Sequence, residues 1–395
     1  MTQTSHTALT ERSVTVLGGG IGGLTAALAL AQRGAMVRVL EQAEAITEVG
    51  AGIQVSPNGL RVLEALGLGA RFREISVKGR AVSLRDYRGG REVTRLDLTR
   101  LPAGQDYRFV HRADLIDLLA EATRAANIRI RLLQKGLSAE PGQPAVLTLC
   151  NGDAVSDQLI VGADGLHSIV RPVLNGTAKP FFTGQVAWRA IVPNTFGHPN
   201  EAQVHMGPGR HLVSYPLRGG TCVNIVAAEE RKTWTAEGWH HSDDPANLRR
   251  SFAGFGGMAS EMLRRVEAPG FWGLFRHPVA ERWHGAGLAL LGDAAHPTLP
   301  FLAQGANMAM EDAYVLADCL AAEPDQETAL ARYQSRRRDR VIRAVDTASG
   351  NAWKYHLRGP MRLAAHLGLG ALGRIAPDRL LHQFDWLYAH DVTKG

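Results

Sequence analysis

The stretch Ser13-Val14-Thr15-Val16-Leu17-Gly18-Gly19-Gly20-Ile21-Gly22-Gly23 decides the fold. Its first five residues are apolar or β-branched and predict a buried strand, and the Ala- and Leu-rich residues 24–32 predict a helix. The glycines between them form the spacing G-x-G-x-x-G, which is typical of a turn that binds a dinucleotide pyrophosphate. Gly18 allows the tight turn, Gly20 lets the backbone approach the phosphates, and Gly23 lets the helix pack closely on the strand. We predict that this loop, Gly22 included, binds the cofactor.

A second strand and an acidic residue follow at the distance that a nucleotide site requires. Residues 36–40, Met-Val-Arg-Val-Leu, predict the strand, and Glu41 ends it. A carboxylate about 20 residues beyond such a glycine loop binds ribose hydroxyls. A glycine-rich turn without any ligand is the alternative, and the succession of strand, helix, strand and acid disfavours it.

Two later segments each place a carboxylate at the end of an apolar strand. Residues 158–163 lead to Asp164, and residues 288–292 lead to Asp293. Open α/β sheets bind ligands at the carboxyl ends of their strands. Asp164 taken alone is equally compatible with an ordinary turn. The turn after Asp293, which leads into a helix from about Gln304, suits an acid that holds the ribityl chain of a flavin.

Together these three motifs resemble the signatures of the group A FAD-dependent aromatic hydroxylases, along essentially the whole chain. Further segments resemble the branch of salicylate hydroxylase, 3-hydroxybenzoate 6-hydroxylase and 6-hydroxynicotinate 3-monooxygenase. They are Gly50-Ala51-Gly52-Ile53-Gln54, Trp188-Arg189-Ala190, His211-Leu212-Val213-Ser214-Tyr215-Pro216 and Ala303-Gln304-Gly305-Ala306. The resemblance implies an α/β fold with a Rossmann-like FAD domain of the glutathione reductase type. It also implies an inserted sheet-based substrate domain, like that of p-hydroxybenzoate hydroxylase, and C-terminal helices.

The chain pattern predicts domains made of non-contiguous pieces. Short alternating strands follow one another between about residues 177 and 276, and helical patterns dominate from about residue 325. We therefore expect an FAD domain from 1–80, 99–176 and 277–325, a substrate domain from 81–98 and 177–276, and a helical region at 326–395.

The strand that contains His211 carries the candidate catalytic residues. Alternate residues of a strand share a face, so His211, Val213 and Tyr215 should point to the same side. The resemblance implies that they line an aromatic pocket, with His211 as base or hydrogen-bond partner and Tyr215 in substrate binding. It also places Gln304 beside flavin and substrate.

The remaining cofactor residues also come from the resemblance. Arg112 matches an arginine that contacts FAD beside the pyrophosphate, and the other matched positions are Gly292, Gly305 and Ala306. Arg189 either lies near the pocket or braces the sheet. Phe301-Leu302 stands where some pyridine-hydroxylating relatives carry a histidine, which disfavours 6-hydroxynicotinate and favours a benzoate or another phenol.

The implied reaction is hydroxylation of a phenolic aromatic acid of the salicylate or hydroxybenzoate type. In the family, NADH or NADPH reduces FAD, and O2 then gives a flavin C4a-hydroperoxide that transfers one oxygen atom. A histidine suits the removal of a phenolic proton, because its pKa lies near neutral pH. The alternatives are another monooxygenase, epoxidase or oxidase on the same scaffold, some acting on larger aromatics, and a non-catalytic flavin-binding redox module.

Composition and charge exclude several other classes. The net charge of +6 comes from scattered basic residues, so we expect no nucleic-acid partner. The densest run, Arg336-Arg337-Arg338-Asp339-Arg340, is interpreted as a solvated helix face. No apolar run is long enough for a membrane span, and the polar N-terminal residues predict a cytoplasmic protein. The three cysteines are far apart, which predicts neither a metal site nor a disulfide framework. We also expect a monomer or homodimer.

Overall fold

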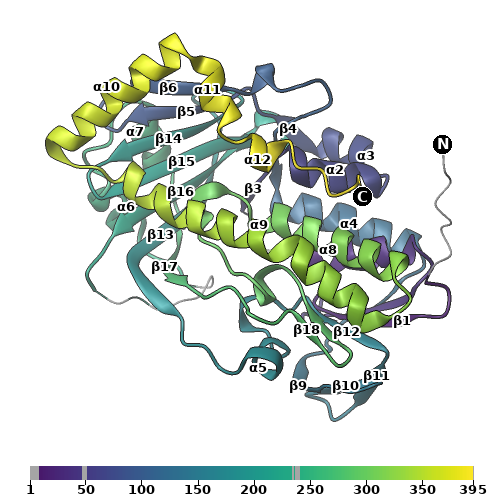
Figure 1. Ribbon diagram of the computed structural model, residues 1–395. Coiled ribbons are helices and arrows are strands. Elements are labelled where there is room, and N and C mark those ends of the chain that lie inside the picture. Colours follow the sequence, from purple (N-terminus) through teal and green to yellow (C-terminus); the bar gives the residue numbers. More distant parts are fainter. Residues whose placement is uncertain (1–8, 47–50, 234, 236–240, 395) are drawn as a thin grey trace.

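A computed structural model describes residues 9–46, 51–233, 235 and 241–394 (Figure 1). The expected strand–turn–helix at the N-terminus is present, and its strand lies within a six-stranded sheet. The order in that sheet is β18 (His284–Gly285), β19 (Leu288–Leu290), β12 (Leu159–Gly162), β1 (Ser13–Leu17), β2 (Met36–Leu40) and β8 (Arg129–Arg131). All neighbours are parallel except β18 and β19. The carboxyl ends of β1, β2 and β12 therefore meet at one edge, as ligand binding in such sheets requires.

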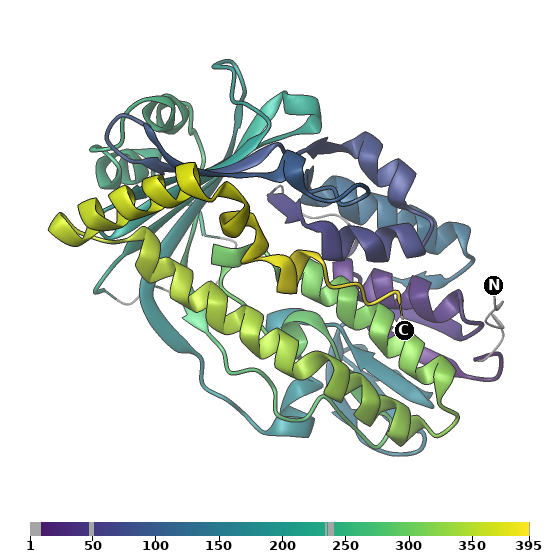
Figure 2. The same ribbon diagram turned by 45° about the horizontal axis from the view of Figure 1, so that its top comes forward.

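Helices enclose this sheet. They are α1 (Ile21–Ala31), α4 (Arg112–Ala125), α8 (Gly305–Ala322) and α9 (Gln326–Tyr355). Helix α1 is buried along nearly its whole length, which explains why its sequence is apolar on all sides. Helix α9 runs beside α8 in both ribbon views (Figures 1 and 2).

A seven-stranded sheet forms the second layer of the molecule. Its order is β17 (Gly270–Arg276), β13 (Phe181–Pro193), β16 (Cys222–Glu230), β15 (Arg210–Leu217), β14 (Glu201–Gly207), β5 (Ala81–Asp86) and β6 (Glu92–Asp97). Strand β5 thus pairs with β14, which lies more than one hundred residues later in the chain, and β6 extends the sheet by pairing with β5. The predicted domain limits stay a prediction.

One face of the seven-stranded sheet is covered by α6 (Pro245–Ser251) and α7 (Met258–Arg264). Trp188 and Leu212 pack there against Phe252 and Phe255. This layer fixes the register of β15, because Leu212 must point into the apolar cluster and its neighbours His211 and Val213 must point to the opposite side.

The remaining elements are short or peripheral. Two three-stranded sheets have the orders β11 (Ala154–Asp157), β10 (Ala145–Leu149), β9 (Gly136–Glu140) and β3 (Gly52–Val55), β7 (Arg108–His111), β4 (Ser76–Lys78). The other helices are α2 (Pro57–Ala65), α3 (Gly69–Ile75), α5 (Arg171–Asn175), α10 (Gly359–Ile375), α11 (Pro377–His382) and α12 (Asp385–Tyr388). Helices α10 and α11 each have a proline in their first two positions, where its missing N–H costs no helical hydrogen bond.

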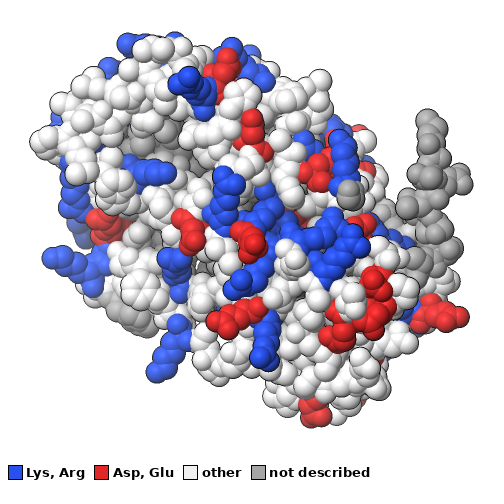
Figure 3. All heavy atoms as spheres, in the orientation of Figure 1, with Lys and Arg blue, Asp and Glu red and all other residues white. Residues whose placement is uncertain are grey.

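The interpretation of residues 336–340 as a solvated face is wrong for Arg337. Its side chain is buried in α9, where Tyr333 and Val341 share its inward face. The guanidinium is neutralised by Glu311 and Asp312 of α8, at 2.6 and 2.7 Å. Basic and acidic side chains are interspersed elsewhere on the face that carries α9 (Figure 3). In the part of the chain that the structure describes, no helix is both long and apolar enough to cross a bilayer.

Candidate active site

A cavity of about 770 Å³ lies between the two main sheets and is lined by residues from Leu17 to Ala309. Every predicted site residue except Gly23 lines it. The lining members are Gly18, Gly20, Gly22, Glu41, Arg112, Asp164, His211, Tyr215, Gly292, Asp293, Gln304, Gly305 and Ala306. Ala51 to Gln54 of the motif that begins at Gly50 are described, whereas Gly50 itself lies outside the described residues.

The glycine loop has the close approaches that its spacing predicts. Gly18 has a φ of +111°, and a Cβ on Gly23 would lie 2.0 Å from the Gly18 carbonyl oxygen. Gly23 therefore allows α1 to pack closely against the turn after β1, and it does not line the cavity. A Cβ on Gly20 would have no heavy atom within 4 Å, since this residue faces open space at the N-terminus of α1. Free N–H groups at a helix N-terminus suit a pyrophosphate.

Two acidic residues of the cavity lie beside the glycine loop. Glu41 accepts hydrogen bonds from the Gly19 N–H at 2.6 Å and the Ala43 N–H at 2.9 Å. Asp164 Oδ2 accepts from the Ile169 N–H at 2.8 Å, whereas its buried Oδ1 has no partner among the described residues. A buried carboxylate oxygen without a donor calls for a hydroxyl or amide from a ligand. These carboxylates and the open glycine loop therefore fit FAD.

Asp293 lies in the turn that follows β19 and lines the same cavity. Its side chain opens into the cavity, and burial within the fold raises its pKa, although His296 and Arg112 act in the opposite direction. The buried Asp312 holds this turn in place. Its Oδ2 accepts a hydrogen bond from the Gly292 N–H at 3.0 Å and lies 2.5 Å from His296 Nε2.

Two arginines give the cavity a positive wall. Burial, together with the charge of Arg189, lowers the pKa of Arg112 to about 10, although Asp293 acts in the opposite direction. A guanidinium with this pKa is still charged at neutral pH. Arg189 lines the cavity and also lies over the Trp272 ring at 5.4 Å, so both interpretations of this residue hold.

The end of the cavity toward the seven-stranded sheet is aromatic and apolar. His211, Val213 and Tyr215 all face it, which confirms the alternation expected for this strand. The His211 ring packs edge-on against Phe301 with 5.2 Å between ring centroids, and Tyr215 packs on Phe109 at 5.2 Å. Burial holds the pKa of His211 well below 6.5, with His356 adding to this effect. Burial also raises the pKa of Tyr215 to about 12, so its phenol stays protonated.

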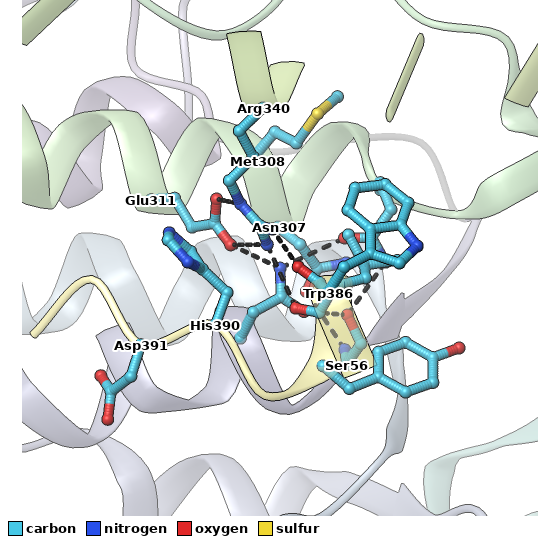
Figure 4. A network of polar contacts seen from close by, with 12 residues as sticks. Ser56, Asn307, Met308, Glu311, Arg340, Trp386, His390 and Asp391 are labelled. Carbon is cyan, nitrogen blue, oxygen red and sulfur yellow. Dashed lines mark hydrogen bonds and ion pairs between the residues drawn. The ribbon is translucent and has the colours of Figure 1, made fainter. Parts of the chain in front are cut away.

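Gln304 lines the cavity, and a buried polar network holds its side-chain amide. Its Nε2 donates to Ser56 Oγ at 2.9 Å, and its Oε1 accepts from Asn58 Nδ2 at 3.2 Å. Asn58 also donates to Glu311 Oε1 at 2.7 Å. Arg340 donates to both oxygens of Glu311, at 2.9 and 2.8 Å, and Figure 4 shows this pair beside residues of the C-terminal segment.

Sequence reasoning missed the residues that support the site. Asn58 and Glu311 position Gln304, and His356 contacts His211. One signal was available, since Glu311-Asp312 interrupts an otherwise apolar helix, and a charged pair in such a helix needs a buried partner. His356 has no comparable signal, because nothing in its local sequence distinguishes it.

Comparison with known proteins agrees with this geometry. The family model described as "FAD binding domain" matches residues 11–348. The chain is 35% identical to 3-hydroxybenzoate 6-hydroxylase of Polaromonas naphthalenivorans, with 96% of each chain covered. It is 32% identical to 3-amino-4-hydroxybenzoate 2-monooxygenase PtnB3 of Streptomyces platensis, with 98% of each covered.

Solved structures give the same result. The chain superposes on Klebsiella pneumoniae HpxO complexed with FAD and uric acid with a TM-score of 0.84 and 27% identity. The match covers 94% of this chain and 95% of the other. The α/β hydroxylase fold expected from the sequence, with its C-terminal helices, is thereby confirmed.

Proposed function

Because this chain belongs to the FAD-binding group A flavin monooxygenases, related to salicylate hydroxylase and 3-hydroxybenzoate 6-hydroxylase, we propose that it hydroxylates a phenolic aromatic acid. NADH or NADPH and O2 are the proposed co-substrates. One observation carries the proposal: His211 and Tyr215 face the same cavity as the residues that fit FAD. A cytoplasmic location, where reduced nicotinamide is available, is part of this proposal.

The cavity walls support a substrate that is aromatic and anionic. Phe301, Val213 and Val226 give an apolar surface against which a benzene ring packs. Arg189 adds a positive charge at the same end, and opposite charges attract strongly where water is excluded. A hydroxybenzoate combines the ring and the carboxylate that these residues suit.

His211 and Tyr215 have protonation states that suit opposite roles. Because burial lowers the pKa of His211, its imidazole is neutral at pH 7 and accepts a proton from the phenolic hydroxyl. Because burial raises the pKa of Tyr215, its hydroxyl stays a hydrogen-bond donor to the substrate. FAD, when bound, supplies the activated oxygen, and the electron-rich phenolate made with the help of His211 receives it.

The test is oxidation of NADH and NADPH by the FAD-loaded protein in the presence of salicylate, 3-hydroxybenzoate, 4-hydroxybenzoate and 3-amino-4-hydroxybenzoate. Hydroxylated product and hydrogen peroxide are quantified together. Stimulated oxidation with a matching amount of product supports the proposal. Stimulated oxidation that gives only peroxide means that the acid triggers flavin reduction without being hydroxylated. Peroxide formed from an acid without NAD(P)H indicates an oxidase, and no stimulation by any acid supports a flavin-binding module or another substrate class.

The variant H211Q tests the role of the histidine. We expect kcat to fall about 100-fold, the lower part of the range for general acid–base catalysis, with little change in FAD content. His284→Gln is the matched control, because His284 is a partly buried histidine that contacts Glu327 instead of the cavity. Equal activity of wild type and H211Q would remove His211 from the proposed mechanism.

A further inference from the structure

Three side chains form a hydrogen-bonded line from the cavity to the protein surface. His211 Nδ1 lies 2.7 Å from His356 Nε2, and His356 Nδ1 lies 3.0 Å from Glu230 Oε1. The side chains of His211 and His356 are buried, whereas that of Glu230 is 41% exposed. The line therefore begins at the substrate end of the cavity and ends in solvent.

The backbone holds these three residues in place. Glu230 ends β16 and His211 lies near the start of β15, which pairs with β16. His356 caps the C-terminus of α9, and its carbonyl accepts a hydrogen bond from the Gly209 N–H at 3.0 Å. The Gly209 carbonyl in turn accepts from the Glu230 N–H at 2.8 Å. A turn and two strand ends thus fix the end of α9 against the sheet.

The carboxylate at the outer end determines the tautomers of both imidazoles. An ionised carboxylate only accepts hydrogen bonds, so His356 carries its proton on Nδ1. The Nε2 of neutral His356 is then an acceptor, and His211 must carry its own proton on Nδ1. The second nitrogen of His211, Nε2, is consequently left unprotonated for a ligand in the cavity. This is the tautomer that a base acting on a phenol needs.

We propose that His211, His356 and Glu230 form a proton relay that carries the phenolic proton of the substrate from the cavity to solvent. The inference rests on the proposed function. The phenolic O–H bond breaks as His211 Nε2 takes the proton, and His211 gives its Nδ1 proton to His356 Nε2. His356 then gives its Nδ1 proton to Glu230, which releases it to water. Both imidazoles end neutral, and they recover the starting tautomers when their rings turn or the next proton returns along the line.

The charges around His356 favour passing the proton on. Burial lowers the pKa of His356, Glu230 raises it, and Arg358 and Arg210 lower it again. Arg358 also binds Glu230 directly, at 2.5 Å. Tyr355, whose ring lies 5.2 Å from that of His211, adds no charge because burial raises its pKa to about 12. A cationic imidazolium is therefore disfavoured at either histidine, and the carboxylate at the outer end of the line is open to solvent.

The relay can be tested on the oxidised, FAD-loaded protein without turnover. The probe is a chromophoric nitrophenol carboxylate, whose phenolate absorbance is followed after rapid mixing at pH 6 to 9. In E230Q the terminal carboxylate is lost, and we expect phenolate to form about tenfold more slowly with a less than twofold change in Kd. In H356Q the line is interrupted at its centre, and we expect a larger loss of rate.

E229Q is the matched control, because Glu229 is the neighbouring residue on the same strand and pairs with Arg210 and Arg231 instead of His356. We expect its phenolate rate to stay within twofold of wild type. Rates for E230Q within twofold of wild type across the pH range would overturn the relay, and so would equal losses in E230Q and E229Q. Failure of the proposed function gives a different result, since the wild type itself would then neither bind nor ionise the probe, and this overturns both proposals.

Discussion

The buried carboxylate of Glu311 should be a major source of stability, and E311Q tests this. Burial by itself raises the pKa of Glu311, but Arg337, Arg340 and the Asn58 amide outweigh that effect and bring the pKa to about 2, from 4.5 in an unfolded chain. Glutamine keeps the size and one oxygen of the side chain while removing its charge. The substitution therefore leaves the buried Arg337 with Asp312 as its remaining carboxylate partner.

The expected loss of stability in E311Q follows from this change in the pKa of Glu311. A pKa of about 2 in the folded chain, against 4.5 in the unfolded chain, corresponds to about 3 kcal/mol in the free energy of unfolding at pH 7. Removal of one partner from a buried ion pair typically lowers the free energy of unfolding by a similar amount, about 3–5 kcal/mol. Because the folded-state pKa is below the unfolded one, this stability is complete above pH 4.5 and is lost as the pH falls toward 2. The difference between wild type and E311Q should thus shrink to less than half by about pH 3.

The assay is urea unfolding of the FAD-loaded wild type and E311Q, followed by tryptophan fluorescence at several pH values between 7 and 3. Glu121→Gln is the control, because Glu121 is also a helical glutamate paired with an arginine, Arg71, but on the surface. It should change stability by less than about 1 kcal/mol. Equal effects of E311Q and E121Q at pH 7 would refute the reasoning, as would a difference that does not depend on pH.

Three substitutions test the cofactor and substrate ends of the cavity. G23A places a Cβ 2.0 Å from the Gly18 carbonyl oxygen, so we expect purified protein with little FAD and a lower Tm; full FAD occupancy would contradict the packing role. G52A places a Cβ 2.4 Å from the Tyr215 ring, so we expect the ring to shift and the KM for the aromatic acid to rise at least tenfold. An unchanged KM would show that Tyr215 does not bind the acid. D293N removes a carboxylate whose pKa burial raises, and we expect FAD to bind about tenfold more weakly by fluorescence titration, whereas unchanged affinity would exclude a direct contact.

Several site residues were predictable because their signals are local. The strand Ser13–Leu17, the turn at Gly18 and the helix α1 follow from β-branching, glycine spacing and an Ala- and Leu-rich composition within about twenty residues. The common face of His211 and Tyr215 follows from the two-residue period of a strand. These features depend on neighbours along the chain, so the sequence alone contains them.

Other features depend on which segments meet in space. Arg337 looked solvated within its basic run, and its burial became evident only once α8 placed Glu311 and Asp312 against it. Periodicity with Tyr333 and Val341 was the local hint, but the preference of arginine for water outweighs that hint until a buried partner is known.

The local sequence thus determined the nucleotide-binding turn, the course of the strands and the face that each side chain presents. The tertiary structure alone decided how the line from His211 to solvent is built. His211 and His356 are 145 residues apart, and His356 and Glu230 are 126 apart, yet their nitrogen and oxygen atoms lie within 3.0 Å. Backbone periodicity carries no information over such separations, because contacts between distant segments depend on how whole sheets and helices pack.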